Sequence, residues 1–199
     1  MKADLKNGFR QFGTHPKDWK YQVYCNGEDE HYIDLACPFG KTNSPLEFCP
    51  PVALFAKSVV AKFKEKDTTY HPVLGTYMDD IFGGLAHDHS YERAMLFRKY
   101  ICETGASLTI RFNMKETKTP LPSTKQVILG CLYDAINRRI RTAEKKREKY
   151  FTRILHVMAS RTTSVKEMQQ LHGNLNFAAQ TAPYGRPFLA HLSNDISEA

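Results

Sequence analysis

The chain has 199 residues, of which 42% are hydrophobic and 12% aromatic, and its formal net charge is +7. This composition is typical of a globular protein of one or two domains and excludes a disordered tail. The positive charge favours an anionic partner. No apolar run approaches the length of a membrane-spanning helix, so we expect no membrane partner.

The cysteines exclude two further classes of protein. They are widely spaced and contain no Cys-x-x-Cys pair, a pattern that predicts neither a disulfide framework nor a zinc finger. The start of the chain is charged and has no signal-peptide pattern. We therefore expect an intracellular protein, cytoplasmic or nuclear, with reduced thiols.

The first third of the chain predicts short strands followed by a helix. Residues 4–11 indicate the end of a strand that turns into irregular chain. Short strands are expected over residues 21–24 and 31–35, on either side of the Asn26-Gly27 turn. Regularly spaced apolar residues predict a helix over residues 45–66.

The middle of the chain predicts a hairpin and a second helix. Pro50 and Pro51 either kink the first helix or mark its true start, and two strands flanking Asp79-Asp80 follow it. His87-Asp88-His89 is interpreted as a polar loop that caps the next helix, because no third metal ligand is evident. That helix is expected over residues 90–103, closed by Gly105.

The last part of the chain predicts strands and then helices. Alternation of apolar and polar residues predicts strands over 108–112, 126–133 and 139–141. A helical pattern covers residues 142–159, and capping-box spacing at Ser164 opens a last helix. This order of elements predicts an α+β domain followed by a mainly helical one, with the boundary near residue 142.

An acidic pair is enclosed by apolar and aromatic residues in Tyr77-Met78-Asp79-Asp80-Ile81-Phe82. Charge at such a place is poorly solvated unless a cation pairs with it, and Mg²⁺ prefers carboxylate oxygens. The alternative is an ordinary surface turn with solvated aspartates, and it stays open from these residues alone.

Two further motifs precede this pair. Asp4 is followed five residues later by Phe9, and Pro38-Phe39-Gly40-Lys41-Thr42-Asn43-Ser44-Pro45 is followed by Phe48. Taken in this order, the three motifs resemble the palm motifs of retroelement reverse transcriptases, which are RNA-directed DNA polymerases. The tail from Leu171 is similar to thumb segments of retrotransposon polymerases, first of the tyrosine-recombinase type and second of the long-terminal-repeat type.

The resemblance implies a fold and a domain order. Residues 1–141 would form an α+β polymerase palm, an antiparallel sheet with helices on one face, and residues 142–199 a mainly helical thumb. Members of the family carry a fingers region before the first motif. Because Asp4 is the fourth residue, we expect the fingers to be largely missing and the chain to be a fragment, a truncated gene product or a decayed copy.

The resemblance also implies nucleotidyl transfer that uses two Mg²⁺ ions, which Mn²⁺ can replace. Asp4 and Asp79 would be the principal metal ligands and catalytic residues, and Asp80 would assist or balance the charge. Asp4 and Asp79 are far apart in sequence, so only adjacent strands of the folded sheet can bring them together.

Further residues are implied to bind the deoxynucleoside triphosphate. Phe9 would pack under the sugar and exclude a 2′ hydroxyl, and Phe39 would lie near the same site. Gly40 would let the backbone approach the nucleotide. Lys118 best matches the palm lysine that contacts pyrophosphate or supplies a proton, with Lys115 as the alternative.

A dense basic run is expected to contact nucleic acid. It comprises Arg138, Arg139, Arg141, Lys145 and Lys146, with Arg147, Lys149 and Arg153 close behind. Clustered cations bind phosphates better than scattered ones do. By resemblance, residues 127–130 form the hairpin that grips the primer end. The implied partners are an RNA or DNA template with its primer, and other domains of a retroelement polyprotein.

Two other functions remain open. A non-catalytic remnant that binds nucleic acid would keep the fold without extending a primer, and the missing fingers favour it. An RNA-dependent RNA polymerase palm is disfavoured by Phe9 at the sugar position and by Tyr77-Met78 before the acidic pair.

Overall fold

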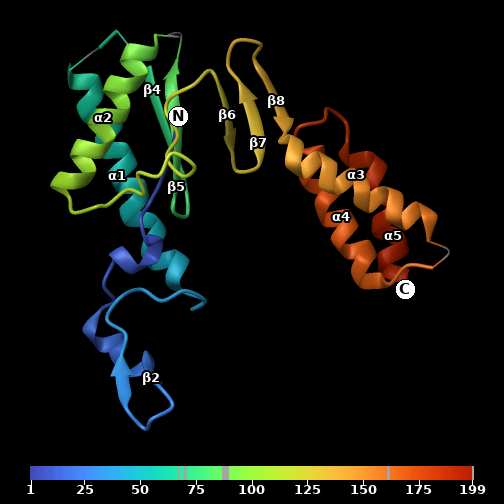
Figure 1. The fold of residues 1–199 in the computed structure, drawn as a ribbon, viewed down its shortest axis with the longest axis horizontal. Helices are drawn as coiled ribbons and strands as arrows, with labels where there is room; N and C mark the ends of the chain where they lie inside the picture. The colour runs from blue at the N-terminus through green and yellow to red at the C-terminus, as the bar shows by residue number, and fades with distance from the viewer. Residues whose placement is uncertain (67, 70, 87–89, 161, 199) are drawn as a thin grey trace. The chain divides into compact units, whose positions relative to one another are not determined.

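A computed structural model describes residues 1–66, 68–69, 71–86, 90–160 and 162–198. Its contacts divide the chain into two compact units, Met1–Ser123 and Thr124–Ala199 (Figure 1). Helices and antiparallel sheets make up both units, so the predicted α+β fold is confirmed. The palm–thumb boundary predicted near residue 142 stays a prediction, and strands 125–142 belong by their contacts to the second unit.

The sheet of the first unit is built around the predicted acidic hairpin. Strands β4 (His71–Tyr77) and β5 (Asp80–Ala86) are antiparallel, and β1 (Lys2–Asp4) pairs with the other edge of β5. The order is therefore β1-β5-β4. Helices α1 (Ser44–Lys66) and α2 (Tyr91–Ser107) pack beside the sheet and against each other (Figure 1).

The core lies between this sheet and the two helices. Ala3, Leu5 and Ile81 come from the strand segments, and their neighbours are apolar residues of the helices. The helix residues are Phe48, Val52, Phe55, Val59, Phe63, Phe97 and Ile101. Because side chains alternate along a strand, Asp4 and Asp80 point to the face opposite to this core.

Helix α1 contains Pro50 and Pro51 in its interior, beyond its first turn. It begins at Ser44, so Pro50 and Pro51 do not mark its start. Each proline lacks the N–H that would donate to the carbonyl four residues earlier, at Leu46 and Glu47. Both of these residues are exposed, so water can reach their carbonyl groups.

Helix α2 continues past Gly105 to Ser107, so the predicted end of this helix is wrong. A Cβ atom on Gly105 would lie 2.5 Å from Phe112 Cε2 and 3.2 Å from the Ile110 carbonyl oxygen. Glycine therefore serves close packing here and does not end the helix.

A methyl group at Gly105 is expected to destabilise the protein. Gly105→Ala should lower the free energy of unfolding by about 1–2 kcal/mol, because Phe112 must move to make room. Gly173→Ala, in helix α4 (Val165–Ala179), is the matched control, since nothing lies within 4 Å of its Cβ position. We expect that change to stabilise by about 0.5 kcal/mol through backbone entropy. Urea unfolding of both variants measures the difference, and equal effects would contradict this explanation.

The strand predicted over residues 108–112 is absent from the described chain. Leu108 caps helix α2, and Thr109 has a positive φ of 60°. Phe112 forms one isolated bridge with Leu5, and the Asn113 N–H donates to the Asp4 carbonyl at 2.8 Å. The segment therefore passes along the end of β1, which places Asn113 next to Asp4.

A short hairpin follows two 3₁₀ turns, η1 (Gly8–Gln11) and η2 (Pro16–Tyr21). Strands β2 (Val23–Cys25) and β3 (His31–Ile33) are antiparallel, which confirms the predicted hairpin. All their residues are exposed, and the rings of Tyr24 and Tyr32 stack with centroids 5.5 Å apart.

The second unit begins with a three-stranded sheet. Strands β6 (Lys125–Ile128), β7 (Cys131–Asp134) and β8 (Arg139–Thr142) are antiparallel neighbours. The single strand predicted over residues 126–133 is wrong. Leu129 and Gly130 form a turn inside it, with φ values of 50° and 80°.

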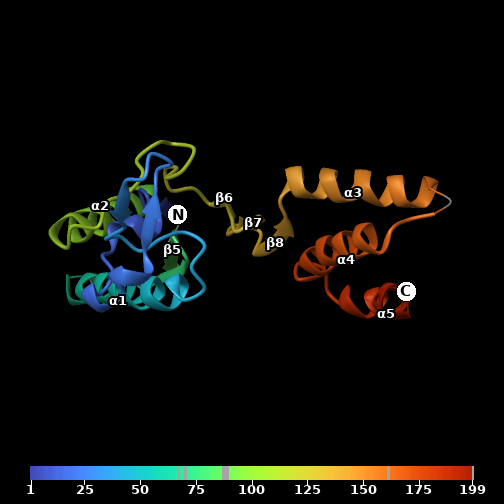
Figure 2. The same ribbon diagram turned by 90° about the horizontal axis from the view of Figure 1, so that it is seen from below.

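Helices complete the second unit. They are α3 (Glu144–Ala159), α4 (Val165–Ala179), the short η3 (Arg186–Leu189) and α5 (Ala190–Glu198). Figure 2 shows α4 between α3 and α5, and α4 contacts both. The predicted capping box at Ser164 is confirmed, with reciprocal bonds to Glu167. Within the described residues, no helix has the length and apolar character needed to cross a membrane.

Candidate active site

Antiparallel pairing brings Asp4 to the acidic pair. Asp4 and Asp80 are directly opposite each other on β1 and β5, and Tyr77 is opposite Asp80 on β4. Asp79 lies in the intervening turn, where its carbonyl accepts a hydrogen bond from the Leu5 N–H at 3.0 Å. The predicted adjacency of these chain segments is confirmed, while their catalytic role stays a prediction.

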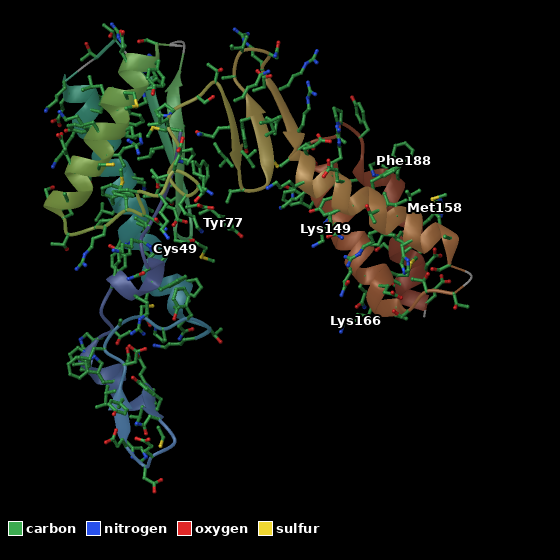
Figure 3. The ribbon with its side chains drawn as sticks, viewed as in Figure 1. Cys49, Tyr77, Lys149, Met158, Lys166 and Phe188 are labelled. Atoms are coloured by element: carbon green, nitrogen blue, oxygen red, sulfur yellow. The ribbon has the colours of Figure 1, made fainter. Side chains whose placement is uncertain are left out.

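The turn that carries Asp79 has an unusual backbone. Met78 has a φ of 51°, a left-handed value that is uncommon for a residue other than glycine. Its sulfur lies 3.8 Å from the Cys49 thiol of helix α1. Figure 3 labels Cys49 and Tyr77 at this end of the sheet. Helix α1 therefore supports the turn from one side.

Asp4 is held by polar contacts from the segment after α2. Asn113 Nδ2 donates to Asp4 Oδ2 at 3.3 Å, and the Asp4 N–H donates to Thr119 Oγ1 at 3.1 Å. Lys118 Nζ lies 3.8 Å from Asp4 Oδ1.

The environment raises the pKa of the Asp4 carboxyl above its ordinary value. Burial is the largest cause, and the charges of Asp79 and Asp80 add to it, while Lys118 and Asn113 act in the opposite direction. Three negative groups therefore share one end of the sheet, and a cation there would relieve their repulsion.

The other two carboxylates have different surroundings. Asp80 Oδ1 forms an ion pair with Lys2 Nζ at 3.0 Å. Asp79 forms no ion pair with a lysine or arginine of the described residues. A Cβ atom on Gly8 would lie 3.4 Å from Asp79 Oδ2, so glycine leaves space beside this carboxylate.

The residue types at this site fit a hard divalent cation, because carboxylate oxygens are the ligands that such ions prefer. In the described part of the chain, however, no three His, Cys, Asp or Glu side chains gather closely enough to hold a metal ion. Lysines hold Asp4 and Asp80 in the present arrangement. Metal binding by these carboxylates therefore stays a prediction.

The aromatic residues predicted to bind the nucleotide lie together. The Phe9 ring packs on buried Phe48, with centroids 4.3 Å apart, and contacts the Phe39 ring edge-on at 5.5 Å. Phe39 is 66% exposed. Gly40 has a φ of +87° with nothing within 4 Å of its Cβ position, so its backbone faces open space.

Comparisons with known proteins point to one fold. No protein-family model and no curated protein matches this chain. A solved structure does: a foamy viral protease-reverse transcriptase in complex with an RNA/DNA hybrid, with a TM-score of 0.68 and 18% sequence identity. The match covers 100% of this chain and 24% of that chain. This chain has the fold of part of a reverse transcriptase.

In this reverse-transcriptase fold, most of the predicted basic residues are exposed. Arg138, Arg139 and Arg141 lie on or beside β8, and Lys145 lies at the start of α3. Figure 3 labels Lys149 farther along the same helix. Exposed cations of this kind are available to phosphates.

Lys146 differs from its neighbours. Its ammonium group lies 3.7 Å from the centroid of the Phe177 ring, and its side chain covers Gly130. The structure therefore gives Lys146 a packing contact between the β6–β7 turn and α4, and its predicted role in binding nucleic acid is untested.

Three residues at the acidic site were not predicted from the sequence. Lys2 precedes Asp4 by two residues, which places both on the same face of β1, so strand periodicity could have found it. Asn113 and Thr119 reach Asp4 across more than a hundred residues, and no local pattern indicates such contacts. His87-Asp88-His89 lies outside the described residues.

Proposed function

We propose that this chain is the polymerase portion of a retroelement reverse transcriptase, which adds deoxynucleotides to the 3′ end of a primer. The observation that carries the proposal is the direct pairing of Asp4 with Asp80, with Asp79 in the adjacent turn. This acidic cluster occurs in a chain with the fold of part of a reverse transcriptase.

The residues of the acidic site have separable tasks in this proposal. Asp4 and Asp79 would hold divalent cations, Mg²⁺ by preference and Mn²⁺ as a substitute. Such ions, when bound, stabilise both the attacking and the leaving oxygens of the displacement. Lys118 is 55% exposed and only loosely paired with Asp4, so its long side chain is free to turn toward a departing pyrophosphate.

Phe9 would select deoxynucleotides. Its ring packs on buried Phe48 and contacts the exposed Phe39, so its movement away from a 2′ hydroxyl is restricted. We expect Phe9→Ala to raise the incorporation of ribonucleotides relative to deoxynucleotides by at least about tenfold. Single-nucleotide extension with each substrate measures the ratio, and Phe9→Tyr is the control that keeps a ring. An unchanged ratio in Phe9→Ala would show that the ring only packs in the core.

The nucleic-acid partner is proposed on two grounds. The structural neighbour was solved with an RNA/DNA hybrid. The second unit of this chain exposes Arg138, Arg139, Arg141 and Lys145 on consecutive elements. We propose that these residues contact the phosphates of a primer bound to an RNA or DNA template.

The test is primer extension on an RNA template by the 199-residue chain. Extension with deoxynucleotides that stops when the divalent cation is chelated would support the proposal. Binding of primer-template without extension would favour the alternative, a non-catalytic remnant of such a polymerase. Incorporation of ribonucleotides in preference would favour an RNA polymerase.

A further inference from the structure

Each of two lysines lies beside a carboxylate of the acidic site, and their surroundings differ. Lys2 Nζ is 3.0 Å from Asp80 Oδ1, and both side chains are mostly covered, with exposures of 23% and 22%. Lys118 Nζ is 3.8 Å from Asp4 Oδ1, and its side chain is 55% exposed. The Lys2–Asp80 ion pair is therefore short and largely covered, whereas the Lys118–Asp4 distance is longer and the Lys118 side chain is exposed.

The position of Lys2 is set by the sheet. Lys2 is opposite Phe82 in the β1–β5 pairing. The adjacent backbone hydrogen bond runs from the Gly83 N–H to the Met1 carbonyl oxygen, at 3.0 Å. Lys2, Asp4 and Asp80 lie on one face of the sheet because their strand positions differ by two residues or are directly opposed. The ammonium group is therefore held next to Asp80 by the backbone register.

We propose that Lys2 is a positioning residue that keeps Asp80 out of the metal ligand set, so that Asp4 and Asp79 alone offer carboxylates to a cation. This inference rests on the proposed function. Lys2 acts as a built-in cation: it neutralises one of the three carboxylates and fixes the Asp80 side chain. Asp79, which has no ion pair with a described lysine or arginine, and Asp4, whose lysine is loosely held, remain available.

Two variants of the Lys2–Asp80 pair test this role of Lys2. Lys2→Met alone releases Asp80, so Mn²⁺ should bind about tenfold more tightly, because the site gains one negative charge and one ligand. Lys2→Met combined with Asp80→Asn removes the pair and leaves the net charge unchanged. Its affinity for Mn²⁺ should therefore stay within about threefold of the wild type. Electron paramagnetic resonance of free Mn²⁺ measures these affinities without requiring catalysis.

Three controls accompany the experiment. Lys6→Met removes the same charge from an exposed residue that forms no ion pair with the acidic site among the described residues, and it should change the affinity less than about twofold. Lys2→Arg should retain wild-type affinity, because it keeps the cation. Asp79→Asn should lower the affinity by at least about tenfold, because it removes a proposed ligand.

The possible failures are distinguishable. If the double variant loses affinity as Asp79→Asn does, Asp80 is a ligand and the inference is overturned while the proposed function stands. If Lys2→Met binds Mn²⁺ no more tightly than Lys6→Met, Lys2 does not position Asp80. If neither the wild type nor any variant binds Mn²⁺, the proposed function fails at this site, and the positioning role fails with it.

Discussion

Asp79→Asn is expected to lower primer extension by at least about a thousandfold while the protein stays folded. Asparagine has the size of aspartate, but it lacks the negative charge that a divalent cation requires. Asp79 lies in a turn and pairs with no lysine or arginine of the described residues, so the fold loses little. Single-nucleotide extension measures the effect, and thermal unfolding checks that the variant is folded.

Asp29→Asn is the matched control for this substitution. Asp29 is an exposed turn residue with a φ of 59°, a conformation that asparagine also tolerates. The same chemical change there should leave extension within about twofold of the wild type, because Asp29 belongs to the β2–β3 turn. An Asp79→Asn variant that extends primers within about tenfold of the wild type would contradict the proposed role of Asp79.

Gly83→Ala is expected to have the largest effect on stability, a loss of about 3 kcal/mol in the free energy of unfolding. A Cβ atom on Gly83 would lie 2.0 Å from the Val73 carbonyl oxygen and 3.0 Å from Leu74 Cα. Both atoms belong to the backbone of β4, so no side-chain rotation can relieve the clash. The β4–β5 pairing must open, which displaces the strand that carries Asp80.

Gly84→Ala is the control on the neighbouring position of β5. Nothing lies within 4 Å of its Cβ position, so we expect a gain of about 0.5 kcal/mol from reduced backbone entropy of the unfolded chain. Urea unfolding of both variants measures the contrast. Similar stabilities for the two variants would show that β4 can move away from β5 at little cost.

Local patterns predicted the elements whose signals lie within a few residues. Apolar residues around Asp79-Asp80 indicated the β4–β5 hairpin, and Ser164 with Glu167 indicated the start of α4. The position of Asp4 opposite Asp80 could be predicted only through the family resemblance, because it depends on pairing across more than seventy residues. The same resemblance selected Lys118, which lies beside Asp4 in the structure.

The errors arose where tertiary contacts decide the local structure. Glycine commonly ends a helix, which is why Gly105 predicted one. In the structure, however, glycine is needed at this position because the Phe112 ring leaves no space for a Cβ atom. The alternation over residues 108–112 is that of a strand, but only Phe112 pairs, because the neighbouring chain turns away after Leu5. The period of β1 places Lys2 on the same face as Asp4, but its ion pair with Asp80 depends on the pairing of β1 with another strand.

Strand β1 places the proposed metal ligand Asp4 and two core residues on alternate positions. Ala3 and Leu5 contribute to the apolar interior, and Asp4 between them faces the other way. A one-residue deletion or insertion in this strand would exchange the two faces, burying a carboxylate and exposing apolar side chains. We therefore expect this segment to tolerate conservative replacements of Ala3 or Leu5 better than a change in its length.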